Sequence, residues 1–509
     1  MSKSPKLYVT IMAVWLLLFG SAVLTSYSQI GRLMHVTPLS GFLVTITLAF
    51  IGYFWLNGVK DVLYTAWCYL FVRSHRITLP YRPLLREPLV LLVYCTRNDF
   101  NGDSLGKSMR QLYGNVRTVI LDDSDKEMYL RQVDEFAATN QVEVVRRIGR
   151  VGFKAGNLNN FLCDAEYDFF VILDSDEVIP PGFIRRMLDY FAANKNTGVV
   201  QANHIATRNI TPFQRKFAIG VDSHWPVYQT VKDEFGFLSL LGHGAMVSRE
   251  CYEAAGGFPL VVAEDICFSL AAREAGYMTV FAPDVTCEEE YPPDYLAFRK
   301  RHNKWTQGNM EFIRRNTWPI LASRQLKWYE KLDIVLFTYA LPLTAVFSLF
   351  IVINVVVLPL VGTTFQYPLW MLAPTLLFLL APMANDVIFH WKAMSKRKLF
   401  SYSGGSMLLY GSMYYTSLKA SLKSMFGKSV FLVTPKNAER VSFREALTVT
   451  RGEWIFALAI MTIAIVCTGS IFPVLLLAVP ALSASYLSVR HQPTRKEMED
   501  VQFLEPASH

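Results

Sequence analysis

Six long segments almost free of charge constrain how this chain of 509 residues can fold. A helix that crosses a bilayer needs about twenty consecutive, mostly apolar residues. Lys3 and Lys6 precede the first segment as they would in a signal peptide, but the segment is long and no small-residue cleavage site follows it. We therefore predict about six retained membrane spans. They cover residues 8–28, 39–57, 334–360, 368–390, 453–469 and 471–489.

The region between the second and third spans has a different character. Charged residues, which make up 18% of the chain, are frequent from about 86 to 290. Short runs rich in β-branched and aromatic residues alternate there with mixed-charge helical stretches, which is typical of an α/β domain with a mainly parallel sheet. The sequence thus predicts an α/β domain inserted between transmembrane α-helices. The expected strands read LVLLVYC, VRTVILD, EVVRRI, FFVILD, TGVVQAN and MTVFAPD.

Basic residues gather in the loops on one side of the predicted spans. Because such loops face the cytoplasm, we expect a multi-pass protein of the cell membrane (plasma or inner) with both termini and the α/β domain in the cytoplasm. The same bias accounts for the net charge of +8, and without zinc-finger spacing or a long basic run no nucleic-acid binding is predicted. Seven scattered cysteines with no CxxC pair fit a reducing compartment.

These features divide the chain into seven segments. They are a helix pair at 1–75, the α/β domain at 86–290, amphipathic interface helices at 291–331, a second helix pair at 332–392, an interface helix with a loop at 398–450, a third helix pair at 451–490 and a tail at 491–509.

Charged residues follow several of the expected strands. Asp174 and Asp176 come directly after FFVIL, and two carboxylates at this spacing suit Mg²⁺ or Mn²⁺ with a bound phosphate. The alternative is a solvated turn closed by Pro180 and Pro181. Glu177 has no assigned role, and we expect it to be structural.

Three other clusters each have an ordinary alternative. Asp122 and Asp123 end a strand, where aspartate is common in turns. Lys154 stands in a glycine-flanked loop and can neutralise a diphosphate or be merely solvated. Glu264 and Asp265 precede a helix, where acids cap the N-terminus, although one of them can also act as a general base.

The order of these clusters resembles a known family. The series DD, KAGN, DSD, GxG, ED and KW, between about 86 and 316, is similar to that of processive family 2 glycosyltransferases, the cellulose, chitin and hyaluronan synthases. FLVTPK at 431–436 resembles the FxVTxK gating loop of cellulose synthases. The resemblance implies a GT-A-type nucleotide-sugar-binding domain, a UDP-sugar donor and a divalent metal, Mg²⁺ or Mn²⁺.

The resemblance also implies a role for individual residues. Asp265 would be the catalytic base, and Asp174 and Asp176 would bind the metal. The nucleotide-sugar would contact Thr96, Asp99, Asp122, Asp123, Lys154, Asp174, Lys304, Thr434 and Lys436. The acceptor would contact His243, Glu264, Arg301 and Trp305.

One motif departs from the family pattern. The family's QxxRW reads Arg301-His302-Asn303-Lys304-Trp305 here. Lys304 keeps the positive charge but lacks the planar fork of arginine. Trp305 keeps an aromatic platform for a sugar ring, although a tryptophan here also suits a membrane interface. This departure leaves the identity of the polymer open.

The leading hypothesis is an inverting, processive glycosyltransferase that polymerises a sugar from a UDP-sugar into a β-linked polysaccharide, with a glucan favoured. It would move the growing polysaccharide, which is the acceptor, across the lipid membrane. The sequence does not identify any accessory protein. A nucleotide diphosphate leaving group needs positive charge and an alcohol nucleophile needs a carboxylate, which fits the residues above. One rival is a non-processive enzyme that adds one sugar to a lipid carrier. The other is a transporter or channel with a degenerate nucleotide-binding domain.

Overall fold

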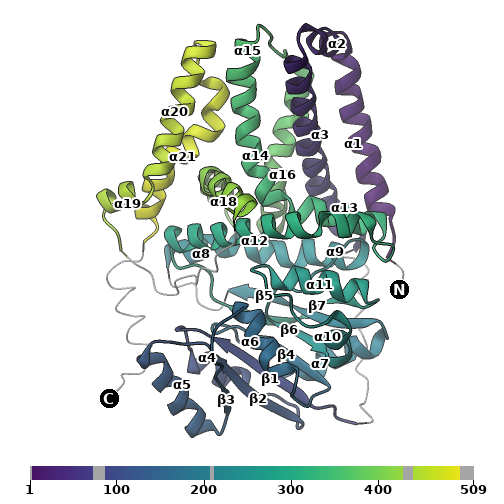
Figure 1. Cartoon of the computed structure of the whole chain (residues 1–509), viewed down its shortest axis with the longest axis vertical. Helices are drawn as coiled ribbons and strands as arrows, with labels where there is room; N and C mark the ends of the chain where they lie inside the picture. Colours follow the sequence, from purple (N-terminus) through teal and green to yellow (C-terminus); the bar gives the residue numbers. More distant parts are fainter. Residues whose placement is uncertain (1–2, 73–85, 207–210, 428–439, 493–509) are drawn as a thin grey trace.

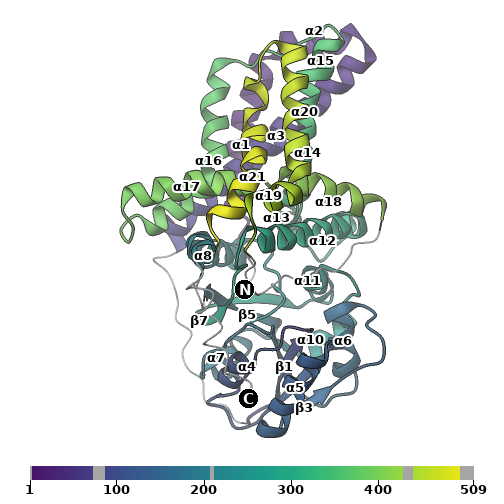
Figure 2. The same ribbon diagram turned by 90° about the vertical axis from the view of Figure 1, so that its left-hand side faces the viewer.

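The computed structural model describes residues 3–72, 86–206, 211–427 and 440–492. Long helices form the upper part of the molecule, and a β-sheet with its covering helices forms the lower part (Figure 1). Helices that run across the long axis of the molecule, such as α12, lie between the two parts (Figures 1 and 2). The described residues thus form three levels.

Six helical stretches within the described residues are long and apolar enough to cross a membrane, as predicted. The second begins at a capping box, in which Thr37 and Ser40 bond each other's backbone N–H groups and Pro38 occupies the first helical position. The stretches are Lys6–Thr25 (α1), Pro38–Val72 (α3 and η1), Ala340–Leu360 (α14, η3 and α15), Leu369–His390 (η4 and α16), Arg451–Thr468 (α20) and Phe472–Arg490 (η5 and α21). The short helix α2 (Tyr27–Val36) connects the first two.

The sheet of the lower part has seven strands in the order β3-β2-β1-β4-β6-β5-β7. Four of the six neighbouring pairs are parallel, and β6 runs antiparallel to both β4 and β5. The sheet is therefore mixed, and the six predicted strands are all present. The strands are β1 (Val90–Thr96), β2 (Val116–Asp122), β3 (Glu143–Val145), β4 (Phe169–Leu173), β5 (Thr197–Ala206), β6 (Ala245–Ser248) and β7 (Met278–Glu289).

Central strand β1 is buried on both faces, which explains its unbroken apolar run. Leu92 packs into the core on one face of the sheet, and Leu91 packs into the core on the other. Because β1, β2 and β4 are parallel, Thr96, Asp122 and Asp174 reach the same edge. The helices of this part are α4 (Gly102–Ser108), α5 (Glu127–Asn140), α6 (Phe153–Leu162), α7 (Phe183–Ala193), α10 (Arg249–Ala255) and α11 (Glu264–Glu274).

The intermediate helices connect the sheet to the long helices. Residues 212–235 were predicted within the α/β domain, but they leave the sheet and pack against α16, where Asn385 Nδ2 donates to the carbonyl of Ser223 at 3.0 Å. The interface helix predicted within 398–450 is instead two helices, because the chain breaks at 412–413, where Tyr295 bonds the Ser412 hydroxyl. These helices are α8 (Pro212–His224), η2 (Trp225–Gln229), α9 (Thr230–Phe235), α12 (Tyr295–Ala322), α13 (Trp328–Thr338), α17 (Lys396–Gly411), α18 (Tyr414–Phe426) and α19 (Phe443–Val449).

Candidate active site

A cavity of about 520 Å³ opens at the carboxyl edge of β1, β2 and β4. The structure brings together twelve of the residues that the sequence singled out, while Asp122 lies behind the wall and Thr434 and Lys436 lie outside the described residues. Those that line the cavity are Thr96, Asp99, Asp123, Lys154, Asp174, Asp176, His243, Glu264, Asp265, Arg301, Lys304 and Trp305.

The two aspartates at the end of β2 form ion pairs with arginines that the sequence motifs did not predict. Arg147 donates to both carboxylate oxygens of Asp123, at 2.9 and 2.7 Å, and Arg146 donates to Asp122 at 2.8 Å. The basic run RRIGR, three residues before KAGN, was the available signal. Asp123 reaches the cavity, whereas Asp122 is fully buried and accepts a bond from the backbone of Ser124.

Asp99 joins the ends of β1 and β4. Its two carboxylate oxygens accept hydrogen bonds from the hydroxyls of Thr96 at 3.0 Å and Ser175 at 2.8 Å. Ser175 is the middle residue of the D-x-D sequence. Asp99 therefore fixes the loop that presents Asp174 and Asp176 to the cavity.

Lys154 faces the D-x-D carboxylates. It forms an ion pair with Asp174 and donates to the carbonyl of Gly242 at 2.8 Å. Burial by itself would lower the pKa of Lys154, but Asp174 outweighs it and raises the pKa above its ordinary value. Gly156 of the KAGN sequence permits this placement, because a Cβ atom there would lie 2.0 Å from the carbonyl oxygen of Val151.

Asp174 and Asp176 present oxygen donors to the same cavity. The side chain of Asp174 is 39% exposed, and one oxygen of Asp176 accepts a bond from the backbone N–H of Glu290 at 3.2 Å. Two carboxylates beside a lysine make a donor set that suits Mg²⁺ or Mn²⁺.

Glu264 and Asp265 occupy the first turn of α11, where the helix dipole favours negative charge. Burial and the neighbouring Asp265 raise the pKa of Glu264 to about 7, and burial also raises the pKa of Asp265. A carboxylate with a raised pKa is a better proton acceptor. This pair is thus suited chemically to acid–base work.

Helix α12 presents one face to the cavity. Arg301, Lys304, Trp305 and Gly308 all line it, and their spacing places them on the same side of a helix. The Arg301 guanidinium lies 4.4 Å from the centre of the Trp305 ring, and Trp305 remains 41% exposed. Trp305 therefore offers an accessible aromatic surface with one cation already against it.

His243 lies in the cavity wall between two buried carboxylates. Its Nδ1 is 3.3 Å from Glu177 and its Nε2 is 3.3 Å from Glu289. Burial would lower the pKa of His243, but Glu177, Asp174 and Glu289 together raise it to about 10. The carboxylate of Glu177, which the sequence left without a role, is fully buried beside this ring.

The far end of the cavity reaches the helices that lead into the third membrane-length stretch. His224 and Lys232 line this end together with Ile334, Phe337, Thr338 and Leu341. The Lys232 ammonium lies 3.6 Å from the centre of the Phe337 ring and 3.4 Å from Asp333. Sequence motifs gave no sign of this end, because its residues come from four separate helices.

Comparisons with known proteins agree with the chemistry of this cavity. Residues 169–385 match the family model for Glycosyl transferase family group 2. The chain is 25% identical over 309 residues to a probable glucomannan 4-beta-mannosyltransferase 6 of Oryza sativa subsp. japonica, covering 57% of this chain and 54% of the relative. It is 24% identical over 247 residues to a probable glucomannan 4-beta-mannosyltransferase 15 of Arabidopsis thaliana, covering 46% of each. The chain thus spans about half the length of the curated relatives it matches.

Among solved structures, the chain is similar to the mannosyltransferase PcManGT from Pyrobaculum calidifontis in complex with GDP-Man and Mn²⁺. The identity is 19% and the TM-score 0.43, over 76% of this chain and 98% of the other. It is also similar to S. aureus TarS 1-349 in complex with UDP-GlcNAc, at 12% identity and a TM-score of 0.35, over 66% of this chain and 90% of the other.

Residues 169–385 are therefore similar to a glycosyltransferase domain, and the described residues also include six membrane-length helical stretches. The matched model is that of family group 2 of the glycosyltransferases, which is the family that the sequence motifs indicated.

Proposed function

We propose that this protein elongates a β-linked polysaccharide by inverting transfer from a nucleotide-sugar. The observation that carries the proposal is the course of the cavity. It runs from Asp123 and Asp174 past Asp265 and Trp305 to Phe337 and Leu341, where the third membrane-length stretch begins. A sugar chain bound beyond Trp305 would therefore point toward the membrane helices, which supports translocation of the product as it grows.

The donor would occupy the end at the sheet edge. Lys154 and Lys304 would neutralise the charge of the leaving diphosphate, and Arg150 lines the same end of the cavity. Asp174 and Asp176 would hold the divalent metal, Mg²⁺ or Mn²⁺, which when bound stabilises negative charge on the diphosphate. Asp99 keeps the loop of both aspartates fixed, so the phosphate-binding groups are preorganised.

The acceptor would lie against Trp305, with its reacting hydroxyl at Asp265. Asp265 Oδ1 accepts a bond from the backbone of Ile266 at 2.8 Å, which fixes the direction of the carboxylate. Its raised pKa suits it to take the hydroxyl proton. Direct attack opposite the leaving group inverts the anomeric carbon, so an α-linked donor gives a β-linkage.

The printed names of the relatives bear on which sugar is used. The sequence alone favoured a glucan made from a UDP-sugar, whereas both relatives are probable glucomannan 4-beta-mannosyltransferases. We therefore propose a β-linked hexose polymer that contains mannose or glucose, made from the corresponding GDP- or UDP-sugar. Thr434 and Lys436 remain proposed contacts of the diphosphate.

We further propose that the catalytic domain and both termini face the cytoplasm. Lys3, near the N-terminus, donates to the carbonyl of Gly236 at 2.8 Å, which supports placing this terminus on the side of the catalytic domain. The excess of Lys and Arg in loops on that side supports a cytoplasmic location.

Transfer of one sugar to a lipid carrier is the second candidate, because a cavity that reaches membrane helices also admits a lipid-linked acceptor. The accessible ring of Trp305 favours a sugar chain, since aromatic rings stack on sugars. A transporter or channel with a degenerate domain fits less well, because Asp174, Asp176 and Asp265 all line one cavity.

The test is a donor panel with the purified full chain in lipid nanodiscs. Labelled GDP-mannose, UDP-glucose and UDP-N-acetylglucosamine are supplied with Mg²⁺ or Mn²⁺, and products are sized and digested with β-mannanase and β-glucanase. We expect a long β-linked product from at least one hexose donor, and none from Asp265→Asn. Asp103→Asn, which changes an exposed carboxylate on α4, is the matched control and should be fully active. A lipid-soluble monosaccharide product would favour the second candidate, and no turnover of any donor would refute both enzymes.

A further inference from the structure

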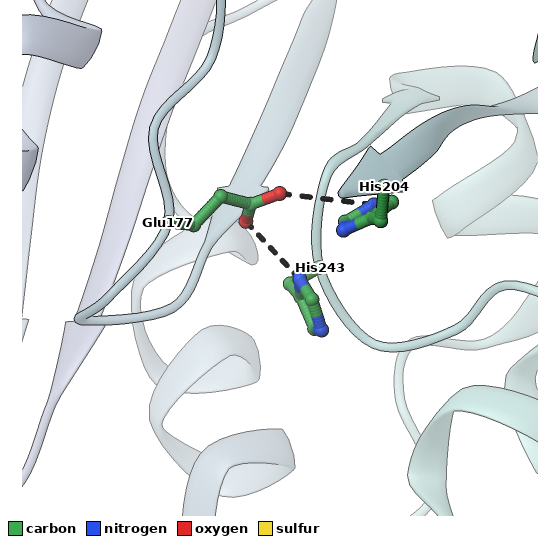
Figure 3. A group of neighbouring side chains, drawn as sticks. All are labelled: Glu177, His204 and His243. Carbon is green, nitrogen blue, oxygen red and sulfur yellow. Dashed lines mark ion pairs between the residues drawn. The ribbon is translucent and has the colours of Figure 1, made fainter. Parts of the chain in front are cut away.

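Three side chains form a buried cluster beside the D-x-D loop, which we call the Glu177 cluster. It consists of Glu177, His204 and His243, whose ligand-type atoms all lie within 4.8 Å of one another (Figure 3). Glu177 Oε2 is 3.3 Å from His243 Nδ1, and Glu177 Oε1 is 3.9 Å from His204 Nε2. The residues come from three segments: the loop after β4, strand β5 and the loop before β6.

Several polar atoms of this cluster lack a hydrogen-bond partner within the described residues. They include Glu177 Oε1, and the side chains of Glu177 and His204 are fully buried. A buried acceptor without a partner costs about 1–3 kcal/mol, so such atoms usually have a ligand or a structural reason.

His204 is arranged as a neutral metal ligand. Its ring stacks on Trp225 with centroids 4.4 Å apart, which fixes its plane. Gln201 Nε2 approaches His204 Nε2 at 3.3 Å, but the same amide has nearer acceptors in the carbonyls of His243 at 3.0 Å and Gly244 at 3.2 Å. The lone pair of His204 Nε2 is therefore not required by Gln201.

Gly244 keeps the space between these groups open. A Cβ atom at this position would lie 2.3 Å from Glu177 Oε1 and 2.4 Å from His204 Nε2. The backbone φ of +59° adds to the preference for glycine. The Gly244 N–H donates to Glu177 Oε2 at 2.9 Å, so the backbone orients the carboxylate without filling the space.

We propose that Glu177, His204 and His243 bind a divalent transition-metal ion. The ligand types favour Zn²⁺, and this ion would be separate from any metal bound with the donor. Two imidazoles and one carboxylate are a common zinc ligand set. Ligands about 2.0–2.2 Å from a tetrahedral ion lie roughly 3.3–3.5 Å apart. One ligand atom of each residue lies within 4.8 Å of the other two, so metal binding would draw the three side chains closer together.

Such an ion would act on the cavity wall. It would tie the segment that follows Asp174 and Asp176 to the loop of His243, and so hold the donor and acceptor halves in one arrangement. His243 would then be a metal ligand whose ring also borders the acceptor space. The inference does not depend on which sugar the protein transfers.

The test measures metal content rather than activity. The full chain is purified in detergent, exposed briefly to EDTA, desalted and analysed for metals by mass spectrometry. We expect about one zinc per chain in the wild type and in Asp174→Asn, which removes a donor-metal ligand. The double variant His204→Gln/His243→Gln should lose at least nine-tenths of it. His302→Gln is the matched control, because His302 is a buried histidine bonded to Ser417 outside the cluster.

X-ray absorption on the wild type gives a second readout that needs no variant. Zinc with two imidazoles and oxygen at about 2.0–2.2 Å would support the proposal. Wild-type protein without a tightly bound transition metal would overturn the proposal. In that case a protonated His243 would supply the positive charge between the carboxylates of Glu177 and Glu289. Metal that stays in the double variant, or that leaves with Asp174→Asn, would overturn it equally.

Discussion

The ion pair between Arg147 and Asp123 yields a sharp prediction about stability. Arg147 donates to both oxygens of Asp123 and also to the carbonyls of Val151 at 2.8 Å and Phe153 at 2.7 Å. The two side chains are 7% and 8% exposed. Arg147→Met keeps the apolar stem but removes these bonds, which leaves a buried carboxylate without its partner.

Removing one partner of a buried ion pair costs about 3–5 kcal/mol. In a domain of roughly 150–250 residues, each kcal/mol lowers the melting temperature by about 2–4 °C. The expected decrease for Arg147→Met is therefore roughly 6–20 °C. Because Asp123 is the source of the penalty, Asp123→Asn added to Arg147→Met should recover part of the loss.

The assay is thermal unfolding of the full chain in detergent, followed with a thiol-reactive dye. Cys251 and Cys287 are fully buried in the catalytic domain and become reactive when it unfolds. Arg117→Met is the control, because its ion pair with Glu143 is exposed and should be worth at most about 1 kcal/mol. If Arg147→Met melts as close to wild type as Arg117→Met, or if Asp123→Asn deepens the loss, the reasoning is wrong.

Three further predictions concern the site. Gly156→Ala should lower the melting temperature clearly, because its Cβ would lie 2.0 Å from the carbonyl oxygen of Val151. Gly404→Ala, in open space on α17, is the control and should melt as the wild type does. Equal melting temperatures of the two variants would contradict this prediction. Trp305→Ala should weaken acceptor use and shorten the product. Trp318, 79% exposed on the same helix, is the control, and Trp318→Ala should leave product length unchanged. Products of similar length from both variants would refute the role of Trp305 as a platform for the sugar chain. Burial and Asp265 raise the pKa of Glu264 to about 7, so the folded state holds a proton that the unfolded chain releases near 4.5, and stability should fall as pH rises from about 4.5 to 7. Melting curves across this range should show a flatter dependence in Glu264→Gln, and an unchanged slope would exclude Glu264 as its cause.

Local patterns in the sequence predicted much of the fold. Continuous apolar runs such as that of β1 identified six strands, and long uncharged segments identified six membrane-length helices. Strand β6 was missed because Ala245–Ser248 is only four residues long and follows a glycine-rich turn. The break between α17 and α18 depends on the contact of Ser412 with Tyr295, which lies 117 positions away and leaves no local pattern.

In the candidate site too, local motifs predicted some residues, and others are brought in only by three-dimensional packing. Asp174, Asp176 and Asp265 follow recognisable motifs, and the cavity brings them together. Their roles in catalysis remain predictions. Lys232 and Phe337 were not predicted as site residues, since only the packing of α9 against the helix α13 brings them to the cavity. Glu177 was expected to be structural, and its burial between two histidines is visible only in three dimensions.

Helix α12 has a consequence for the biosynthesis of the protein. The sheet is complete at Glu289, but Lys304, Trp305 and Phe337 follow it in the chain. Arg299 on the same helix bonds Glu453 at the start of α20, with its Nε 2.8 Å from Oε1. A nascent chain released from the ribosome as far as residue 290 would thus have the carboxylates proposed to bind the donor but not the wall proposed to bind the acceptor. Under the proposed function, catalytic competence would arise late in translation, after membrane insertion has progressed.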